Sequence, residues 1–209
     1  INTLSANTGN EGEISLQWNC VADDGLSQGG SVSSYIVRFA TFNIQNDSDF
    51  NSAMTFTQSW NPQAPGQSQS NKLTGLTSGR SYYIALKSVD KTNNNSPLSN
   101  VPYCGAGADA TAPFAVTTFN AQQGDYLGQI KLTWVAPGDN GTSGNLTGTN
   151  IEGDSYSGYY VVRYRTNGSI TSANWGTSSN PTELEPSPVL PGAVEQMTVG
   201  GLTAGTTYY

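Results

Sequence analysis

The amino-acid sequence predicts an all-β protein made of two consecutive antiparallel β-sandwiches. Apolar and polar residues alternate in short runs separated by Gly- and Asn-rich turns, the period-two pattern of half-buried strands. No stretch shows helical periodicity. The pattern also occurs twice along the 209 residues, in units of about a hundred residues, each large enough to bury a core of its own.

The repeat is visible as three pairs of similar segments. The paired segments are 12–25 with 128–141, 35–39 with 160–164, and 76–83 with 202–209. Because the pairs keep one order, each position in the first copy predicts a role in the second. Structural roles are therefore predicted in pairs: Trp18 with Trp134, Leu76 with Leu202, and Tyr82 with Tyr208.

The strands follow from the alternation, taken in chain order. Apolar side chains that should share the core face come from runs 14–20, 35–39 and 82–89 in the first copy and from 130–134 and 160–164 in the second. The runs are separated by turn clusters at 23–25, 93–96 and 139–141, rich in Asp, Asn and Gly. Such a series of short strands is typical of sandwiches.

The motifs resemble the fibronectin type III domain, in the form found in secreted and cell-surface proteins of bacteria. They are Trp in the second strand, Tyr-x-Val-x-aromatic in the third, and Leu-x-x-Gly-x-x-Tyr before a long strand. The resemblance implies two immunoglobulin-like sandwiches. It also implies that Tyr82 and Tyr208 are tyrosine-corner residues, whose hydroxyls bond to upstream backbone.

The resemblance also sets the predicted domain limits. They are 1–101 for domain 1, 102–115 for the linker and 116–209 for domain 2. Segment 96–100 resembles a last strand, and 111–113 resembles an inter-domain joint. The second copy has no counterpart of 84–100, so we expect it to be incomplete at its C-terminal end. Either the chain continues, or another chain supplies a strand.

Two departures from the pattern concern packing. The loop after the third strand is long in both copies, and we expect Ile44 with Phe50, and Ile170 with Trp175, to anchor it to the sandwich edge. Asn71 stands where the second copy has Met197. A polar residue at an inward position needs a hydrogen-bond partner or a place at a sheet edge.

Composition excludes several classes of function. The net charge of −7 disfavours nucleic acids and anionic membranes, whose phosphates would be repelled. The absence of histidine removes Ser-His-Asp and Cys-His catalysis. No apolar run approaches the ~20 residues of a membrane-spanning helix. We predict no catalytic residues.

Few residues remain as site candidates. Asp23, Asp24 and Asp139 offer oxygen ligands for calcium, but their setting favours structural turns. We therefore predict no cofactor, with calcium as the weaker alternative. Glu183 and Glu185 match a glycosidase pair in type, although their Pro-rich loop favours a solvated position.

Aromatic and cysteine residues allow two further roles. Trp60, Trp175, Tyr156 and Tyr159 are able to stack on sugar rings, against the alternative of core or edge packing. Cys20 is expected to be buried and free. Cys104 is expected after the last strand, far from Cys20, so that an intradomain disulfide is disfavoured. A bond from Cys104 to another subunit is the alternative.

Serial modules more often hold, space or bind than catalyse. We therefore expect a non-catalytic, extracellular or cell-surface module pair, acting as a structural, spacer or adhesive part of a longer protein, including a stalk or filament. Expected partners are proteins, including other copies of the chain, and carbohydrate. The alternative is an accessory region of a secreted polysaccharide- or protein-degrading enzyme.

Overall fold

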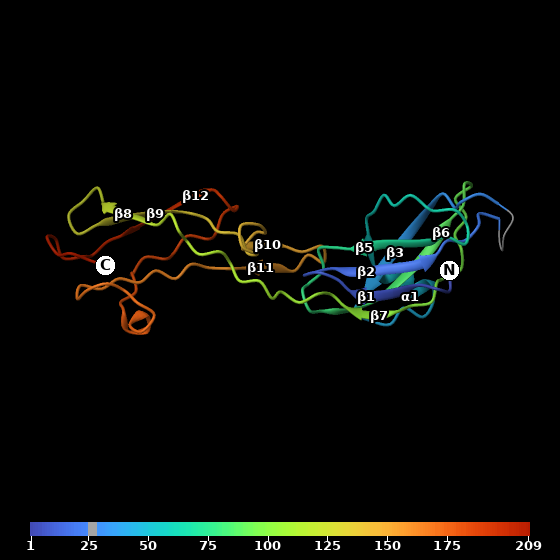
Figure 1. Cartoon of the computed structure of the whole chain (residues 1–209), viewed down its shortest axis with the longest axis horizontal. Helices are drawn as coiled ribbons and strands as arrows, with labels where there is room; N and C mark the ends of the chain where they lie inside the picture. Colours follow the sequence, from blue (N-terminus) through green and yellow to red (C-terminus); the bar gives the residue numbers. More distant parts are fainter. Residues whose placement is uncertain (25–28) are drawn as a thin grey trace. The chain divides into compact units, whose positions relative to one another are not determined.

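The computed structural model describes residues 1–24 and 29–209 (Figure 1). The described chain is almost entirely β, with one α-helix and one 3-10 turn. It divides into two compact units: unit 1 contains Ile1–Ala110 and Asn150–Gly153, and unit 2 contains Thr111–Thr149 and Asp154–Tyr209. Unit 1 thus includes residues 102–110, which the sequence placed in a linker. Within the described ranges, no helix is long and apolar enough to cross a membrane.

Unit 1 is a sandwich of two antiparallel sheets. The first sheet has the order β1 (Ser5–Thr8), β2 (Ile14–Asn19) and β5 (Ser68–Leu73). The second has the order β4 (Met54–Phe56), β3 (Ser34–Ala40), β6 (Ser81–Val89) and β7 (Tyr103–Gly105). The alternation in 14–20 and 35–39 sends every second side chain between the sheets. The prediction of all-β sandwich architecture is confirmed.

The core of unit 1 centres on Trp18. Its ring meets the edge of Tyr35 at 5.1 Å between centroids and an angle of 84°. Aliphatic side chains from both sheets complete the cluster, among them Leu16, Val37, Leu73, Ile84 and Leu86. Burying each of these stabilises the fold by roughly 1.5–3 kcal/mol relative to exposure.

A buried polar network lies beside this core. The Cys20 thiol donates to Gln69 Oε1 at 3.2 Å, and the Tyr35 hydroxyl donates to the same oxygen at 3.2 Å. Asn71 lies on β5, an edge strand, and its Oδ1 accepts from Gln69 Nε2 at 3.0 Å. The polar residue at an inward position therefore has both the partner and the edge location that it needs.

The end of the unit 1 sheet differs from the prediction. Segment 96–100 runs beside β6 through bonds such as Ser99 N to Leu86 O, 3.1 Å, but the last regular strand is β7. Pro97 and Pro102 have no N–H to give to the ladder, so it is interrupted here. Cys104 is thus within a strand, opposite Tyr82, and not after it. Both cysteines are free.

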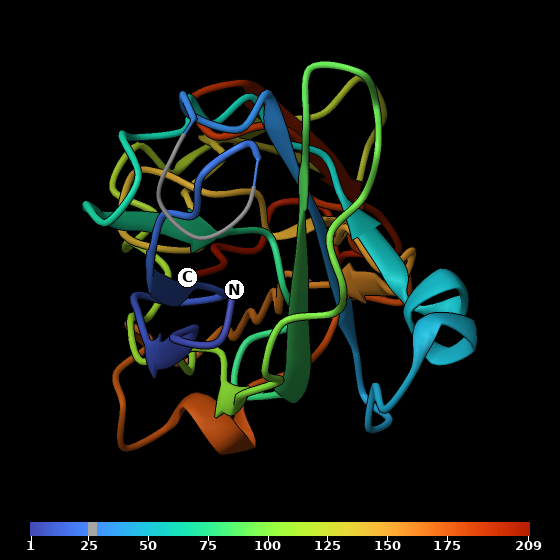
Figure 2. The ribbon, with the colours of Figure 1, turned by 90° about the vertical axis from the view of Figure 1, so that its right-hand side faces the viewer.

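A short helix, α1 (Asp47–Ser52), fills the long loop after β3 and lies beside β4 at the sheet edge (Figure 2). The Asn46 side chain caps it by accepting from the N–H groups of Ser48 and Asp49. Ile44 and Phe50 are buried at 1% and 3% exposure, as expected for anchors. The alternation pattern did not predict the helix, because six residues are too few for a helical period to be visible.

Unit 2 repeats the first sheet more completely than the second. Its three-stranded sheet has the order β12 (Val194–Val199), β9 (Ile130–Val135) and β8 (Asn120–Gln123). A hairpin of β10 (Thr147–Thr149) and β11 (Ser155–Ser157) was not predicted. A 3-10 turn, η1 (Trp175–Thr177), follows. Trp134 meets Tyr160 edge-on at 5.1 Å and 80°, the arrangement found at Trp18.

Residues 160–164 do not form the regular strand that their alternation predicts. Only Tyr164 is bridged, to Ser179. Arg165 and Tyr209 exchange two backbone hydrogen bonds of 3.1 and 2.9 Å, at the repeat position of the Ala40–Tyr83 pair. In unit 1 that pair is the end of a seven-residue ladder between β3 and β6. In unit 2 the matching pair, Arg165 with Tyr209, is not continued into a ladder. A strand requires a continuous ladder as well as an alternating sequence.

The second predicted anchor is only partly as expected. Trp175 is 42% exposed, and the Arg163 guanidinium lies 5.9 Å from the centre of its ring. Ile170 is half-buried. The loop of unit 2 is therefore fixed less deeply than that of unit 1, because an exposed ring contributes less apolar burial than Phe50 does.

Candidate functional site

The most organised polar cluster of unit 1 is the turn before β6. Gly75 and Gly79 have φ values of +78° and +74°, a left-handed conformation that favours glycine. They fold the turn back so that Leu76 is buried and Thr77 N–H reaches the hydroxyl of Tyr82 at 3.3 Å. The side chain of Tyr82 is fully buried at the start of β6.

A carboxylate is held in this turn. Segment Asn150–Gly153 belongs to unit 1, and Glu152 Oε1 accepts hydrogen bonds from the Tyr82 hydroxyl, from Thr77 N–H at 3.0 Å and from Thr77 Oγ1 at 2.9 Å. Its Oε2 accepts from Arg80 Nη1 at 2.7 Å. The Glu152 side chain is only 2% exposed. The turn therefore acts as a receptor for one carboxylate.

The backbone of the held segment is bound too. Ile151 N–H donates to Gly75 O at 3.2 Å. The Asn150 side chain donates to Thr77 Oγ1 at 2.7 Å and accepts from Glu152 N–H at 2.9 Å. A Cβ on Gly75 would lie 2.9 Å from Ile151 Cγ2, so the close approach also requires glycine at this position. Recognition thus covers a three-residue turn as well as one side chain.

The charges in this cluster shift two pKa values. Burial, as the larger cause, and the hydrogen bond to Glu152 together raise the pKa of Tyr82 to about 12. Burial alone would raise the pKa of Glu152, but the hydrogen bonds from Tyr82, Thr77 and Arg80 outweigh it, so that this pKa is lowered. The carboxylate is accordingly held in its charged form, as an acceptor of four hydrogen bonds.

Unit 2 contains the same turn. Thr203 N–H donates to the Tyr208 hydroxyl at 2.9 Å, as Thr77 does to Tyr82. Leu202 N–H donates to Gly128 O at 3.0 Å, matching the bond of 3.1 Å from Leu76 to Gly12. The backbone of the two turns is therefore fixed by equivalent hydrogen bonds.

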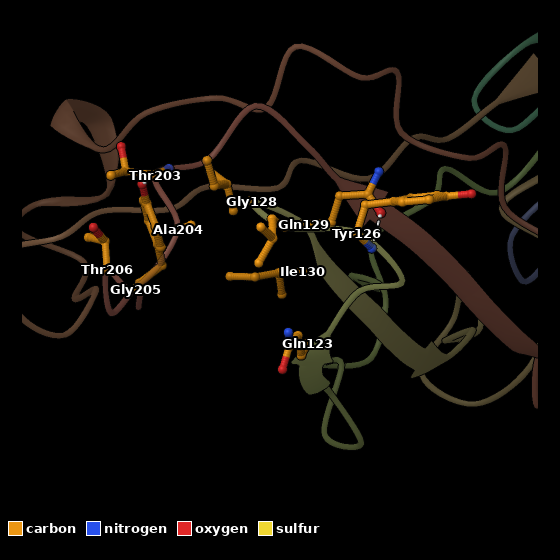
Figure 3. Close-up of a pocket in the computed structure, with 12 residues that line it drawn as sticks. Gln123, Tyr126, Gly128, Gln129, Ile130, Thr203, Ala204, Gly205 and Thr206 are labelled. Carbon is orange, nitrogen blue, oxygen red and sulfur yellow. Dashed lines mark hydrogen bonds between the residues drawn. The ribbon is translucent and has the colours of Figure 1, made fainter.

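A pocket of about 390 Å³ adjoins this second turn (Figure 3). Residues 203–206 form one side of it and residues 128–130 the other. Tyr126 and Leu127 stand at its rim and are 74% and 84% exposed. Its lining includes no Asp, Glu, Lys, Arg or Cys side chain, so it presents neutral donors and apolar surface.

The acidic residues proposed for calcium occupy turns. Asp23 N–H bonds to Gly30 O at 3.0 Å, and its carboxylate lies 3.5 Å from Lys91 Nζ. Asp24 lies against Gly29, and Gly25 of the same predicted turn lies outside the described residues. Asp139, in unit 2, bonds through its N–H to Gly144 O at 3.1 Å. Asp23 and Asp139 thus lie in turns through their backbone hydrogen bonds.

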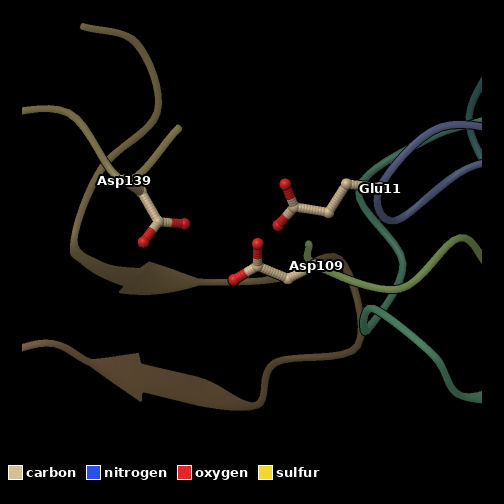
Figure 4. A group of neighbouring side chains, drawn as sticks. All are labelled: Glu11, Asp109 and Asp139. Atoms are coloured by element: carbon tan, nitrogen blue, oxygen red, sulfur yellow. The ribbon is translucent and has the colours of Figure 1, made fainter. Parts of the chain in front are cut away.

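Two other carboxylates lie together in unit 1. Glu11 and Asp109 each offer an oxygen within 4.8 Å of the other (Figure 4), and Asp139, also drawn there, belongs to unit 2. The Glu11–Asp109 pair was missed because its members lie far apart in the sequence. Two oxygens are well short of the six to eight that Ca²⁺ takes, and we assign no metal to them.

Glu183 and Glu185 have backbone partners. Glu183 Oε1 accepts from Gly200 N–H at 2.8 Å, and Glu185 Oε1 accepts from Val162 N–H at 3.3 Å. The sequence predicted a solvated position for this part of the loop, whereas Glu183 Oε2 is buried. Both residues hold loop 180–191 against neighbouring backbone, a structural role.

The four aromatic candidates have different surroundings. Trp60 packs on Trp18 at 5.7 Å and on Phe56 at 5.8 Å between ring centroids, which is core-edge packing. In unit 2, Tyr156, Tyr159 and Trp175 are 44%, 80% and 42% exposed. Their exposed rings keep the surface needed for stacking on a sugar.

The comparisons with known proteins gave matches among solved structures alone. No family model matches the chain, and no curated protein matches it. Among solved structures, the FN1–FN3 domains of chicken CNTN1 are 13% identical, with a TM-score of 0.30. The match covers 98% of this chain and 55% of that one.

Proposed function

We propose that this chain is a non-catalytic pair of fibronectin type III-like modules with a structural, spacer or adhesive role. The observation that carries the proposal is the duplicated core. Trp18 with Tyr35, and Trp134 with Tyr160, have the same edge-to-face geometry at 5.1 Å. A module built twice in series supplies length and surface, and such arrays serve mainly to hold, space or bind.

The chemistry of the side chains supports a non-catalytic role. The sequence has no histidine and only 11% charged residues. Glu183 and Glu185, the strongest candidates for acid catalysis, are bonded to backbone N–H groups. The pocket of unit 2 has no acid, base or thiol in its lining apart from the phenols of Tyr126 and Tyr208, so it lacks a nucleophile–base pair.

The proposed location is extracellular, on a secreted or cell-surface protein. Its support is the resemblance of the repeat motifs to bacterial secreted modules, together with the surface rich in Ser, Thr and Asn. The test is antibody labelling of intact and permeabilised cells that express the full-length protein. We expect labelling of intact cells. Labelling that appears only after permeabilisation would contradict the proposal.

A stalk or filament role would use contacts between copies. Residues 160–163 have no ladder partner among the described residues, and Val161 is 44% exposed. A strand from a second copy is able to add to such a segment. Sedimentation velocity tests this. We expect a dimer or larger species whose share falls when Val161→Pro removes one N–H donor, with Val116→Pro, at an exposed valine outside this segment, as the matched control.

The second candidate is an accessory region of a secreted degradative enzyme. The exposed rings of Tyr156 and Tyr159 favour it, because such rings stack on sugars. Affinity electrophoresis in gels containing polysaccharide tests it. Retardation that is lost in Tyr159→Ala but kept in Trp60→Phe would support sugar binding. Unchanged mobility of the original chain would exclude it for the polysaccharides used.

A further inference from the structure

We infer that the pocket beside Tyr208 in unit 2 is a binding site for a glutamate-bearing turn of a protein partner. The inference rests on the proposed role as an interaction module and names the chemistry of the partner. Its basis is the internal repeat: the equivalent turn in unit 1 holds Asn150–Gly153 through its backbone and through the Glu152 carboxylate.

The recognition groups are retained in unit 2. In unit 1 the ligating atoms are Gly75 O, Thr77 N and Oγ1, and Tyr82 Oη. The repeat places Gly201, Thr203 and Tyr208 at these positions. The turn conformation is retained as well, since Gly201 and Gly205 have φ values of +67° and +74°. The fifth group that contacts the held turn is the Arg80 guanidinium, which has no counterpart in unit 2. Four of the five groups are therefore retained.

The space for a ligand is present too. A Cβ on Gly75 would meet Ile151 Cγ2 at 2.9 Å, whereas a Cβ on Gly201 would meet no described atom within 4 Å. The Tyr208 hydroxyl accepts from Thr203 N–H, and among the described residues its own proton has no acceptor. In unit 1 that proton goes to a carboxylate. A carboxylate in the pocket would complete the same set of bonds.

Two substitutions between the repeats adjust the charge. Arg80 is replaced by Thr206, which removes a cation that donates to Glu152. Glu11 is replaced by Leu127, which removes an anion near the turn and adds apolar surface at the rim. The pocket therefore attracts an acidic turn through neutral donors and through apolar contact with a residue such as Ile. Its affinity should be modest, since the ion pair that Arg80 makes with Glu152 at 2.7 Å in unit 1 has no counterpart in unit 2.

The experiment titrates a peptide into the isotopically labelled 209-residue chain and follows amide resonances by NMR. The probe is the capped hexapeptide Thr-Asn-Ile-Glu-Gly-Asp, the sequence of residues 149–154. The control peptide has Gln in place of Glu. We expect a saturable shift of the Thr203 resonance at peptide concentrations up to about 5 mM, because few contacts give millimolar affinity. The Thr77 resonance should move much less, because its site is occupied by Glu152.

Three variants sharpen the result. Thr206→Arg restores the missing cation and should tighten binding by about tenfold. Tyr208→Phe should weaken it by about fivefold through loss of one hydrogen bond. Tyr103→Phe, at an exposed tyrosine of unit 1, should have no effect. No saturable shift at Thr203 in either the original chain or Thr206→Arg would overturn the inference, as would equal binding of the Gln peptide. A spacer role would survive either outcome.

Discussion

The hydroxyl of Tyr82 donates a hydrogen bond to the carboxylate of Glu152, and both side chains are almost completely removed from water. A buried carboxylate is costly unless it is fully hydrogen-bonded. Here Thr77 and Arg80 supply the remaining donors. The stability of unit 1 therefore depends on the ionisation of Glu152 at acidic pH and on that of Tyr82 at alkaline pH.

The acidic side is tested with Glu152→Gln. Because the pKa of Glu152 is lowered in the folded state, its charge stabilises unit 1 above the ordinary carboxyl pKa, and that stabilisation is lost as the pH falls through the lowered value. At neutral pH we expect Glu152→Gln to lower the free energy of unfolding by about 1–3 kcal/mol. The difference from the original chain should shrink towards acidic pH, measured by urea unfolding with NMR signals of unit 1.

A matched control is Glu13→Gln. Glu13 is also ion-paired, to Lys72 at 2.8 Å, but the lysine side chain is 52% exposed. Exposed pairs contribute little, about 0–1 kcal/mol. Equal effects of the two substitutions across the whole pH range would contradict a special role for Glu152.

The alkaline side is tested with Tyr82→Phe. The pKa of Tyr82 rises from 10.0 to about 12 on folding. The folded state thus keeps a proton that the unfolded state releases, so that stability present below pH 10 is lost as the pH rises through the folded pKa of about 12. Burial raises the pKa of Tyr35 and of Tyr160 as well, so spectroscopic titration of tyrosinate should show several late-ionising groups, one of which is lost in Tyr82→Phe. All of them should remain in the exposed variant Tyr103→Phe, and an unchanged number in Tyr82→Phe would refute the assignment.

We expect the two core tryptophans to contribute unequally to the free energy of unfolding of their units. Trp18 is 1% exposed and packs on both Tyr35 and Trp60, whereas Trp134 packs on Tyr160 and on Phe119, itself 53% exposed. We expect Trp18→Ala to cost about 3–5 kcal/mol and Trp134→Ala to cost less. Thermal unfolding monitored separately for each unit measures both. A larger loss for Trp134→Ala would show that unit 2 has the better-packed core.

How far the sequence predicts the fold depends on which interactions a segment needs. Residues 14–20 and 130–135 were predictable because alternation alone decides which face is buried. Residues 160–164 have the same alternation but lack the ladder that makes β3 a strand. Helix α1 depends on the cap at Asn46, a local bond without periodicity. Such features become visible only when their hydrogen-bond partners are known.

The candidate site was predictable only in part, for a related reason. Tyr82 and Tyr208 belong to a motif with fixed spacing, so the sequence identified them. The partner of Tyr82 did not belong to any motif, since Glu152 lies 70 residues along the chain in an unremarkable acidic turn. The sequence did offer one indication of this turn: Gly75 in the first repeat and Gly201 in the second occupy the same position. A glycine at matched positions indicates a turn, but not what approaches it.

The two glycines provide the sharpest comparison of the two turns. Both have positive φ, so replacement by Ala strains each backbone by about 1 kcal/mol. Gly75→Ala also places a Cβ 2.9 Å from Ile151 Cγ2, whereas Gly201→Ala meets no described atom within 4 Å. We therefore expect Gly75→Ala to destabilise unit 1 by clearly more than Gly201→Ala destabilises unit 2, as measured by urea unfolding. In Gly75→Ala the Thr77 amide should also exchange faster with solvent, because the held turn is displaced. Equal losses in the two variants would mean that Ile151 does not pack on Gly75.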